Sequence, residues 1–439
     1  MSNLSFKEFD PVSEKAWKQK IQVDLKGKDY NEAMLTATDE GIDIKPFYHR
    51  DSHIDFKIPS PSKWFITEQI EDKDINNIKT FKAKGLEAFC LNVDNLKTIY
   101  KSLDASETPF ILKLKQFNLD DLQQKNHLFY AFDPIYQFIK TGNWLKNKTT
   151  DLEKHHKYVK KSFNLSIDTR LYHNAGANIT QQLAYTIAHL NTYFKNLKNH
   201  SKSLNTKLNI LVFTSIGPNY FFEIAKLKAL RLLVNTLCKN QNINYDLKIS
   251  SEPGLHHTSI YDYNVNMLRS TTECMSAVLG GSDFVCNKTY DEIFKNKNDF
   301  SDRIAKNQLL ILKHESYFDK VENPADGTYY INHITKALSE KALDIFKSIE
   351  KSGGFIQQLF DGKIQYKIDQ QFQKTLEKFK NEKMKLVGVN IYKNEDEQMK
   401  RQLDKDIFPT KAKRKTLIKP IISRRIAESL EKERLAKEA

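Results

Sequence analysis

Short runs rich in β-branched and aromatic residues alternate along this chain with longer segments whose apolar residues recur at helical spacing. Alternation of this kind predicts an α/β fold, in which helices connect the strands of a parallel sheet. Eight such runs, spread with their helices over about 230 residues, match the size and order of a (β/α)8 TIM barrel. An open doubly wound sheet is the alternative. The runs are Trp64–Ile70, Leu86–Val93, Phe110–Gln116, Leu128–Phe132, Phe163–Asp168, Leu208–Thr214, Leu247–Ser251 and Asp283–Cys286.

The predicted helices differ in how much of their surface is apolar. One carries a single apolar stripe and has Asn178 or Thr180 available as its N-cap. The segment Phe221–Cys238 is apolar around most of its circumference, which predicts burial between the sheet and other helices. A second striped helix ends at Gly280-Gly281, because glycine accepts the backbone geometry of a helix stop. The first stripe consists of Ile179, Leu183, Ile187, Leu190, Phe194 and Leu197, and the second of Val265, Leu268, Thr272, Met275 and Leu279.

The parts of the chain outside the barrel are predicted to be appendages. Residues 1–62 form an N-terminal arm, residues 63–300 the barrel, and residues 301–392 a helical appendix packed on it. Residues 393–439 form a basic tail with a final helix, and from Pro409 onward this tail has ten Lys or Arg against four Glu. Segments of this composition have few apolar anchors and fold mainly against a partner. We therefore expect the arm and the tail to wrap around one.

Composition limits the classes of function. The chain is 40% hydrophobic and 28% charged, and no apolar run approaches the roughly 20 residues that cross a bilayer. The N-terminus has no secretion signal and the four cysteines occur singly, as reduced core thiols do, so a cytoplasmic location without membrane association is predicted. The net charge of +14 raises the question of nucleic acid, but no nucleic-acid-binding motif accompanies it and no such partner is predicted.

Candidate chemistry is sought first where the barrel strands end, because active sites of barrels lie on the loops there. After the fifth run, Arg170, Tyr172 and His173 could together bind an anionic acyl group and deliver a proton. The alternative is that Gly176 makes the turn into the next helix and His173 is a packing histidine. The residues favour this second interpretation.

Three other features carry weaker signals. His256 and His257 follow the seventh run, but adjacent histidines cannot point the same way and no third ligand is spaced for a metal. Gly280-Gly281 resembles a phosphate cradle, yet it precedes the eighth run and so lies opposite the catalytic face. The D-x-H sequence at Asp51–His53 lacks the glycine expected three residues later, where Phe56 stands. No metal site is predicted.

Several longer segments carry a family resemblance that covers most of the chain. They are Thr38–Tyr48, Asn219–Arg231, Arg269–Glu273 with Ala277–Gly281, Arg303–Asn307, Glu315–Val321 and Asn323–Tyr330. In this order they resemble the motifs T-x-E-G-I-x-x-x-P-L-Y, F-x-E-I-A-K-L-R-A-x-R, R-T-T-x-E with A-V-L-G-G, R-I-A-R-N, E-S-Y-F-D-R-V and D-P-A-G-G-S-Y-Y of the adenosylcobalamin-dependent methylmalonyl-CoA mutases. The resemblance implies a TIM barrel related to enzymes that interconvert methylmalonyl-CoA and succinyl-CoA.

The resemblance also implies that catalytic groups are missing here. Catalytic members carry G-Y-H-x-Q-E-A-G-A after strand five, and alignment on Ala175–Ala177 places Arg170 and Leu171 opposite that Tyr and His. Tyr261 stands where catalytic chains have a substrate-contacting Gln. The motifs that embrace coenzyme A are reduced to Ser62–Gln69, and the cobalamin-binding domain with D-x-H-x-x-G is not found.

These departures are those of the small, non-catalytic subunit of the heterodimeric mutases. The resemblance thus implies a large catalytic mutase subunit as partner, with adenosylcobalamin bound to that partner. On this chain we expect no catalytic residue, cofactor or metal, and only a degenerate pocket mouth at Arg170, His173 and Tyr261. The alternative is the substrate half of a split acyl-CoA mutase that uses a separate cobalamin protein. Intact Tyr-His and Gln positions would favour that alternative, and they are absent.

Overall fold

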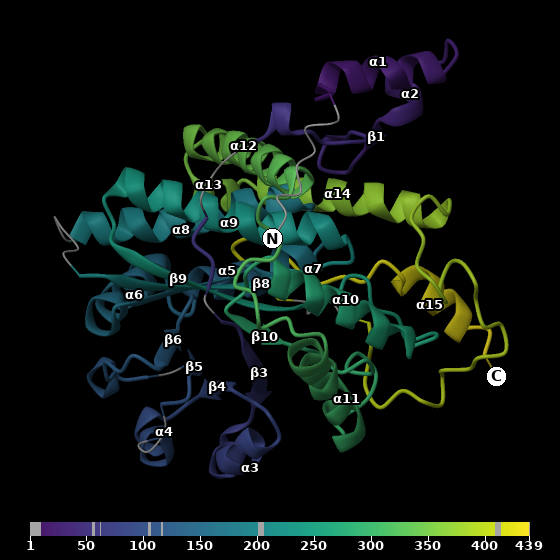
Figure 1. The fold of residues 1–439 in the computed structure, drawn as a ribbon. Helices are drawn as coiled ribbons and strands as arrows, with labels where there is room; N and C mark the ends of the chain where they lie inside the picture. The colour runs from purple at the N-terminus through teal and green to yellow at the C-terminus, as the bar shows by residue number, and fades with distance from the viewer. Residues whose placement is uncertain are drawn as a thin grey trace, which may run out of the picture.

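The core of the protein is an eight-stranded parallel barrel surrounded by helices (Figure 1). The computed structural model describes residues 10–54, 58–61, 63–103, 107–115, 117–200, 206–408 and 414–438. Every predicted run coincides with or overlaps one strand of this sheet, and the structure extends two of them, so the TIM-barrel prediction is confirmed. The strands are β3 (Phe65–Ile70), β4 (Ala88–Val93), β5 (Phe110–Leu114), β6 (Leu128–Ala131), β7 (Asn164–Asp168), β8 (Leu208–Ile216), β9 (Tyr245–Pro253) and β10 (Phe284–Cys286).

The strand order is β6-β5-β4-β3-β10-β9-β8-β7, and each neighbouring pair is parallel. β6 and β7 are therefore the two ends of the ladder, and side chains bridge the seam between them. The Ser166 hydroxyl accepts the backbone N–H of Phe132 at 2.9 Å, and the Asp133 carboxylate accepts the backbone N–H of Asp168 at 2.8 Å. The barrel is thus closed at this seam by side-chain hydrogen bonds.

Asp133 is the centre of the seam. Its carboxylate, 8% exposed, also accepts hydrogen bonds from the Tyr193 hydroxyl at 2.6 Å, from His189 Nε2 at 3.1 Å and from the N–H of Tyr136 at 2.8 Å. Burial alone would raise the pKa of the Asp133 carboxyl, but His189 and the hydrogen bonds hold the pKa below its ordinary value. One ionised side chain therefore ties β6, β7 and the helix α8 together.

Helices cover the outside of the barrel. α8 (Ile179–His200) buries all six residues of its predicted stripe, and the Asn178 side chain accepts the N–H of Gln181 at its start. α9 (Tyr220–Gln241) is buried along most of its length, as predicted, because α12 (Tyr329–Lys351) packs across α8 and α9. The remaining barrel and appendix helices are α3 (Ile78–Ala83), α4 (Leu96–Leu103), α5 (Pro134–Thr141), α6 (Lys148–Ser162), α7 (Arg170–Asn174), α10 (Val265–Leu279), α11 (Asp299–Leu310), α13 (Phe355–Phe360) and α14 (Lys363–Lys380). In the described part of the chain, no helix is both long and apolar enough to span a membrane.

Aromatic side chains fill the inside of the barrel. The ring of Phe284 stacks on Phe65 at 5.5 Å and meets the edge of Phe129 at 5.4 Å between centroids. Phe213 belongs to the same interior cluster, together with smaller residues of four strands. These smaller residues are Ala88, Cys90, Ile111, Ala131 and Leu211. The barrel axis is therefore a packed core.

The N-terminal arm stands off the body of the protein (Figure 1). It contains α1 (Glu14–Asp24), α2 (Tyr30–Met34), the two-stranded pair β1 (Thr36–Ala37) and β2 (Asp43–Ile44), and a short 3-10 turn. None of the residues of α1 is buried. The arm is fixed to α12 at its base, where the ring of Tyr48 lies 5.1 Å from the rings of Tyr330 and His333.

The C-terminal tail packs on its own barrel. Ile418 and Ile421 are buried, and the N–H of Ile421 donates to the carbonyl of Ile139 in α5 at 3.0 Å. The tail then reaches Ile426, which is fully buried, and ends in α15 (Glu428–Leu435). The expectation that this tail folds mainly against a partner is therefore wrong for residues 414–438, because widely spaced isoleucines anchor it to this chain. Its start at Pro409 lies outside the described residues.

Asp133→Asn is expected to lower the free energy of unfolding by about 2–4 kcal/mol at pH 7, since it removes a buried, paired charge. The pKa of this carboxyl is lowered on folding, so its contribution is fully present above the unfolded pKa of about 3.9 and is lost as the pH falls through the folded pKa. Urea unfolding between pH 3 and 7 should show the difference between wild type and variant shrinking below about pH 4. The control Asp344→Asn, at an exposed position, should change the unfolding free energy by less than about 0.5 kcal/mol. A difference that is independent of pH would contradict this assignment.

Candidate functional site at the barrel mouth

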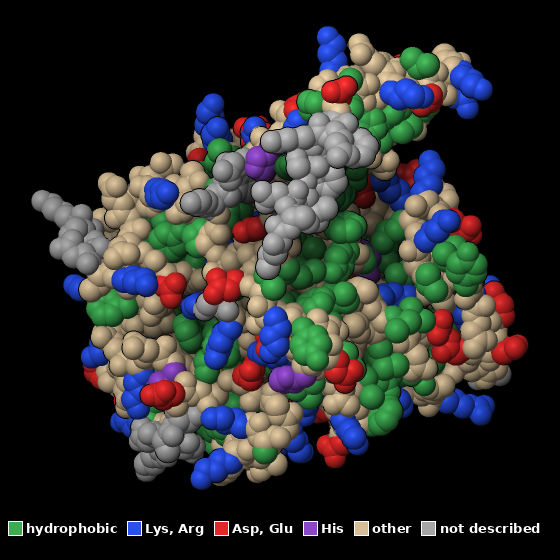
Figure 2. All heavy atoms as spheres, in the orientation of Figure 1, with side chains coloured by type: hydrophobic (Ala, Val, Ile, Leu, Met, Phe, Trp, Pro, Cys, Tyr) green, Lys and Arg blue, Asp and Glu red, His purple; other side chains and the backbone are tan. Residues whose placement is uncertain are grey.

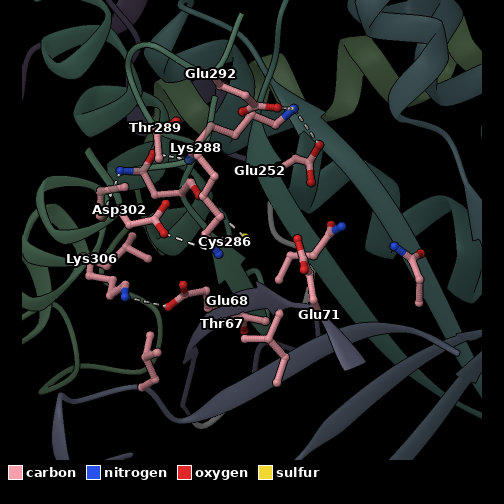
Figure 3. Close-up of a pocket in the computed structure, with 18 of the residues that line it drawn as sticks. Thr67, Glu68, Glu71, Glu252, Cys286, Lys288, Thr289, Glu292, Asp302 and Lys306 are labelled. Carbon is pink, nitrogen blue, oxygen red and sulfur yellow. Dashed lines mark hydrogen bonds and ion pairs between the residues drawn. The ribbon is translucent and has the colours of Figure 1, made fainter. Parts of the chain in front are cut away.

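The carboxyl ends of the strands open into a cavity of about 770 Å³ (Figure 3). Its walls come from β3, β4, β9 and β10, from the start of α7 and from α11. This is the end of a barrel where active sites are built. Residues that supply charged or polar groups to it include Glu68, Asn92, Arg170, Glu252, Lys288 and Lys306.

Arg170 occupies the inner side of this cavity and is held by two carboxylates. Its guanidinium makes two hydrogen bonds to Asp168, Nε–Oδ1 at 2.9 Å and Nη2–Oδ2 at 2.5 Å, and a third from Nη1 to Glu252 Oε2 at 2.7 Å. Lys288 Nζ lies 3.1 Å from the other oxygen of Glu252. The Arg170 side chain is 17% exposed, so these pairs are only weakly screened by water.

The charges of this cluster balance one another. Burial alone would raise the pKa of the Glu252 carboxyl, but the charges of Arg170 and Lys288 hold the pKa below its ordinary value. Burial would conversely lower the pKa of Lys288, and Glu252 raises it instead. Glu252 thus remains ionised at neutral pH and neutralises cations that could otherwise attract an anionic ligand.

The ring of Phe213 lies next to two of the basic side chains at this end of the barrel. The guanidinium carbon of Arg170 lies 5.2 Å from the centre of the Phe213 ring, and Lys113 Nζ lies 5.3 Å from it. Phe213 in turn belongs to the interior aromatic cluster. The barrel interior next to Arg170 is therefore filled by aromatic packing.

The outer wall of the cavity also carries paired charges. Lys306 lies 3.3 Å from Glu68, Lys297 lies 3.3 Å from Asp302, and Lys73 lies 2.7 Å from Glu71. Burial raises the pKa of the Glu68 carboxyl, although Lys306 opposes the rise. The lining is therefore a mixture of both signs, as Figure 3 shows for the labelled side chains.

His173 points away from the cavity into the barrel wall. It is 5% exposed, Nδ1 lies 3.3 Å from the Gln182 amide, and its ring centre is 5.9 Å from His257 and 6.2 Å from His256. Burial, and next the charge of Lys226, hold the pKa of His173 well below its ordinary value, so the ring is neutral.

Two glycines make the space for this ring. A Cβ on Gly254 would collide with the ring of His173, and a Cβ on Gly217 would lie 2.8 Å from its Cε1. Gly217 directly follows β8 and Gly254 directly follows β9. The backbone of both loops therefore packs closely on the imidazole of His173. His173 consequently has no free path to a ligand in the mouth.

Tyr261 lies in a separate cluster beneath α15. Its ring is fully buried, its hydroxyl donates to Glu438 at 2.5 Å, and the guanidinium of Arg434 stacks on it at 3.9 Å. The structure therefore does not bring Arg170, His173 and Tyr261 together in one pocket, and only Arg170 lines the cavity.

Sequence reasoning did not single out Glu252, Lys288, Glu68 or Lys306. Glu252 lies within β9 at its carboxyl end, and Lys288 lies two residues after β10. The rule that site residues lie at the carboxyl ends of barrel strands could have identified these two. The pairing of Lys306 with Glu68 joins α11 to β3 across most of the chain, and no local pattern signals it.

The D-x-H residues Asp51 and His53 make contacts within the arm and with α12. The Asp51 carboxylate accepts the N–H of Glu14 at 2.9 Å within the arm, and the ring of His53 packs 5.1 Å from Tyr329. Phe56 lies outside the described residues. Among the residues that the structure does describe, no group of three or more His, Cys, Asp or Glu could hold a metal ion.

The closed parallel barrel, with its mouth formed by the strand ends, places the protein among the α/β TIM barrels. Residues 130–437 match the methylmalonyl-CoA mutase family. The chain belongs to that family.

Among its relatives, the methylmalonyl-CoA mutase small subunit of Porphyromonas gingivalis is 27% identical over 441 residues, which cover 89% of this chain and 71% of the relative. Methylmalonyl-CoA mutase of Rhizobium meliloti is 33% identical over 53% of this chain and 34% of its own length. The methylmalonyl-CoA mutase large subunit of Propionibacterium freudenreichii subsp. shermanii is 30% identical over 53% of this chain and 33% of its own length. The chain thus spans most of a small subunit and about a third of the longer mutases.

Gly254→Ala is expected to reduce the free energy of unfolding by about 1–3 kcal/mol, because the new methyl group overlaps the buried ring of His173. The double variant Gly254→Ala with His173→Ala should lose less than the sum of the two single losses, since the overlap is gone. Urea unfolding of the three variants and the wild type forms the double-mutant cycle that measures this. Additive losses would mean that the glycine is not required by the imidazole.

Proposed function

We propose that this chain is the non-catalytic subunit of a heterodimeric, adenosylcobalamin-dependent methylmalonyl-CoA mutase. In this proposal the large partner subunit binds the cofactor and isomerises methylmalonyl-CoA and succinyl-CoA, and this chain supports the partner's structure. The observation that carries the proposal is that Arg170 and Lys288, the buried cations at the barrel mouth, are already paired with carboxylates of this chain.

The first part of this observation is the pairing of Arg170. An anionic acyl group at this guanidinium would compete with Asp168 and Glu252; a displaced Asp168 would be left buried without its ion partner, whereas Glu252 would keep Lys288. Breaking such a pair costs about 3–5 kcal/mol. That cost opposes substrate binding at the one candidate residue that faces the cavity.

The second part is the tail, which covers the loops after β7 and β9. The N–H of Arg424 donates to the carbonyl of Asn174 at 2.8 Å, and the N–H of Ile426 donates to the carbonyl of His256 at 2.9 Å. The family resemblance places the catalytic Tyr, His and Gln of active members on these two loops. Here Leu171 is buried and Tyr261 is sealed under α15.

The third support is the kind of relative that the chain resembles over its length. It covers 71% of a protein named as a small subunit, whereas it covers only about a third of the mutases named without that qualifier or as large subunits. The small-subunit role extends naturally to this chain, with a large mutase subunit as its partner.

The test is co-expression of this chain with the large mutase subunit of the same organism. We expect a one-to-one complex by size-exclusion chromatography with light scattering. Bound adenosylcobalamin and turnover of methylmalonyl-CoA should follow the large chain, and this chain alone should show no saturable binding of methylmalonyl-CoA by calorimetry. Failure to form the complex would overturn the proposal. Turnover by this chain with only a separate cobalamin protein would support a split acyl-CoA mutase in its place.

A further inference from the structure

Acidic and basic side chains are spread over the face of the molecule that Figure 2 shows, where water solvates them. Glu273 of α10 is an exception, because it is only 4% exposed. Within the part of the chain that the structure describes, no ion pair or hydrogen bond joins its carboxyl group to another side chain. A buried carboxylate without such a partner is costly, whereas a protonated carboxylic acid is not.

The buried ammonium group of Lys226 on α9 is bound by other acceptors. Its Nζ lies 2.5 Å from Glu223 Oε2 and donates to the carbonyl of Ser215 at 2.6 Å. Burial raises the pKa of the Glu223 carboxyl, while Lys226 and the N–H of Gly217 oppose the rise. Glu223 has these partners and Glu273 has none, so of the two buried carboxyl groups Glu273 is the one that holds a proton.

The surroundings of Glu273 favour the protonated form. Burial raises the pKa of its carboxyl well above the ordinary value, and the negative charge of Glu223 adds to the rise. The neutral ring of His257 does not titrate together with Glu273, because burial holds its pKa well below the ordinary value. The titratable and charged groups that face Glu273 are Glu223 and Lys226 of α9, Arg269 and Cys274 of its own helix, His257 after β9, and Lys288, Tyr290 and Glu292 after β10.

Arg269 lies one helical turn before Glu273 but is bound elsewhere. Its guanidinium donates from Nη1 to Asn266 at 2.7 Å and from Nη2 to the carbonyl of Val387 at 2.6 Å. The second bond ties α10 to the turn at residues 386–391. Residues four apart on a helix are neighbours, so the same guanidinium can reach Glu273. Both side chains line one small cavity of about 20 Å³, which leaves room beside them.

We propose that Glu273 is a proton-dependent switch that controls where Arg269 binds. With the proton on Glu273, Arg269 holds the turn at residues 386–391 on α10. When the proton passes to solvent, the carboxylate attracts the guanidinium away from the carbonyl of Val387. The guanidinium moves because a full negative charge in a buried site binds it more strongly than a neutral carbonyl does.

The turn that Arg269 holds is packed against the C-terminal tail. Leu386 and Val389 of the turn lie in one buried apolar cluster with Ile426 and Ala427 of the tail. Release of the turn would therefore loosen the packing of the tail, which covers the loops after β7 and β9. The switch thus links pH to the cover of the barrel mouth.

The first test compares the melting temperature of the full chain with that of Glu273→Gln, which copies the protonated form. The pKa of Glu273 is raised on folding, so its contribution to stability is fully present below the unfolded pKa of about 4.3 and is lost as the pH rises through the folded pKa. Wild type and variant should melt together near about pH 4, and the variant should melt about 2 °C or more higher at about pH 9.

The matched control is Glu377→Gln at an exposed position of α14, whose melting temperature should follow that of wild type at every pH. If Glu273→Gln instead melts below wild type throughout the pH range, Glu273 is ionised and its charge is needed, and the proposal is overturned.

The second test follows the turn itself with a nitroxide label on Val387→Cys. The Val387 side chain is 47% exposed, and its substitution leaves the carbonyl acceptor in place. Label mobility, measured by electron paramagnetic resonance, should rise with pH. Adding Glu273→Gln should keep the mobility low at every pH, and adding Arg269→Gln should keep it high. Labelling of the chain without Val387→Cys measures the background from the native cysteines. Mobility that is independent of pH in the presence of Glu273 and Arg269 would mean that Arg269 does not move, which overturns the switch.

Discussion

A guanidinium group placed just inside the rim of a barrel must be paired, because an unpaired buried charge costs several kcal/mol. Arg170 satisfies this constraint with carboxylates from β7 and β9, and Glu252 in turn pairs with Lys288 after β10. Three strand ends are thereby held in one charge network above the ring of Phe213. The same network makes the mouth unsuited to an anionic substrate, since its cations already have partners. The contacts that stabilise these strand ends therefore also oppose the binding of an anionic substrate.

Two further features restrict the space near the mouth. Phenylalanines occupy the barrel axis, and the tail is hydrogen-bonded to the loops after β7 and β9. Neither feature weakens the barrel: the aromatic rings bury apolar area, and the seam between β6 and β7 is closed separately through Asp133. A barrel of this family can therefore lose its substrate-binding groups and keep its fold, because the residues that stabilise the barrel are not those that bind the substrate.

Most of the fold was predictable because it depends on periodicity within one segment. Strand runs and the α8 stripe have the correct type and place, since alternation and helical spacing are local signals. What each apolar face contacts is not local. The α10 stripe has the same periodicity as that of α8, yet its Leu268 is exposed while Met275 and Leu279 pack on the core. The tail isoleucines contact α5 across nearly 300 residues of sequence. Tyr261 was placed at the mouth by alignment and His173 by its position after the fifth strand, whereas packing under α15 and between glycines removes both from it.

The outcome for α10 shows why an apolar stripe alone does not reveal what it contacts. Ser270, Cys274 and Ala277 are buried, Met275 and Leu279 pack on the same core, and Leu268 is 67% exposed. A single exposed leucine is ordinary on a protein surface, so packing within this chain explains most of the pattern. The role proposed for the protein rests instead on the paired charges at the mouth. Because Arg170 and Lys288 already pair with carboxylates, an anionic acyl group would have to compete with those carboxylates for them.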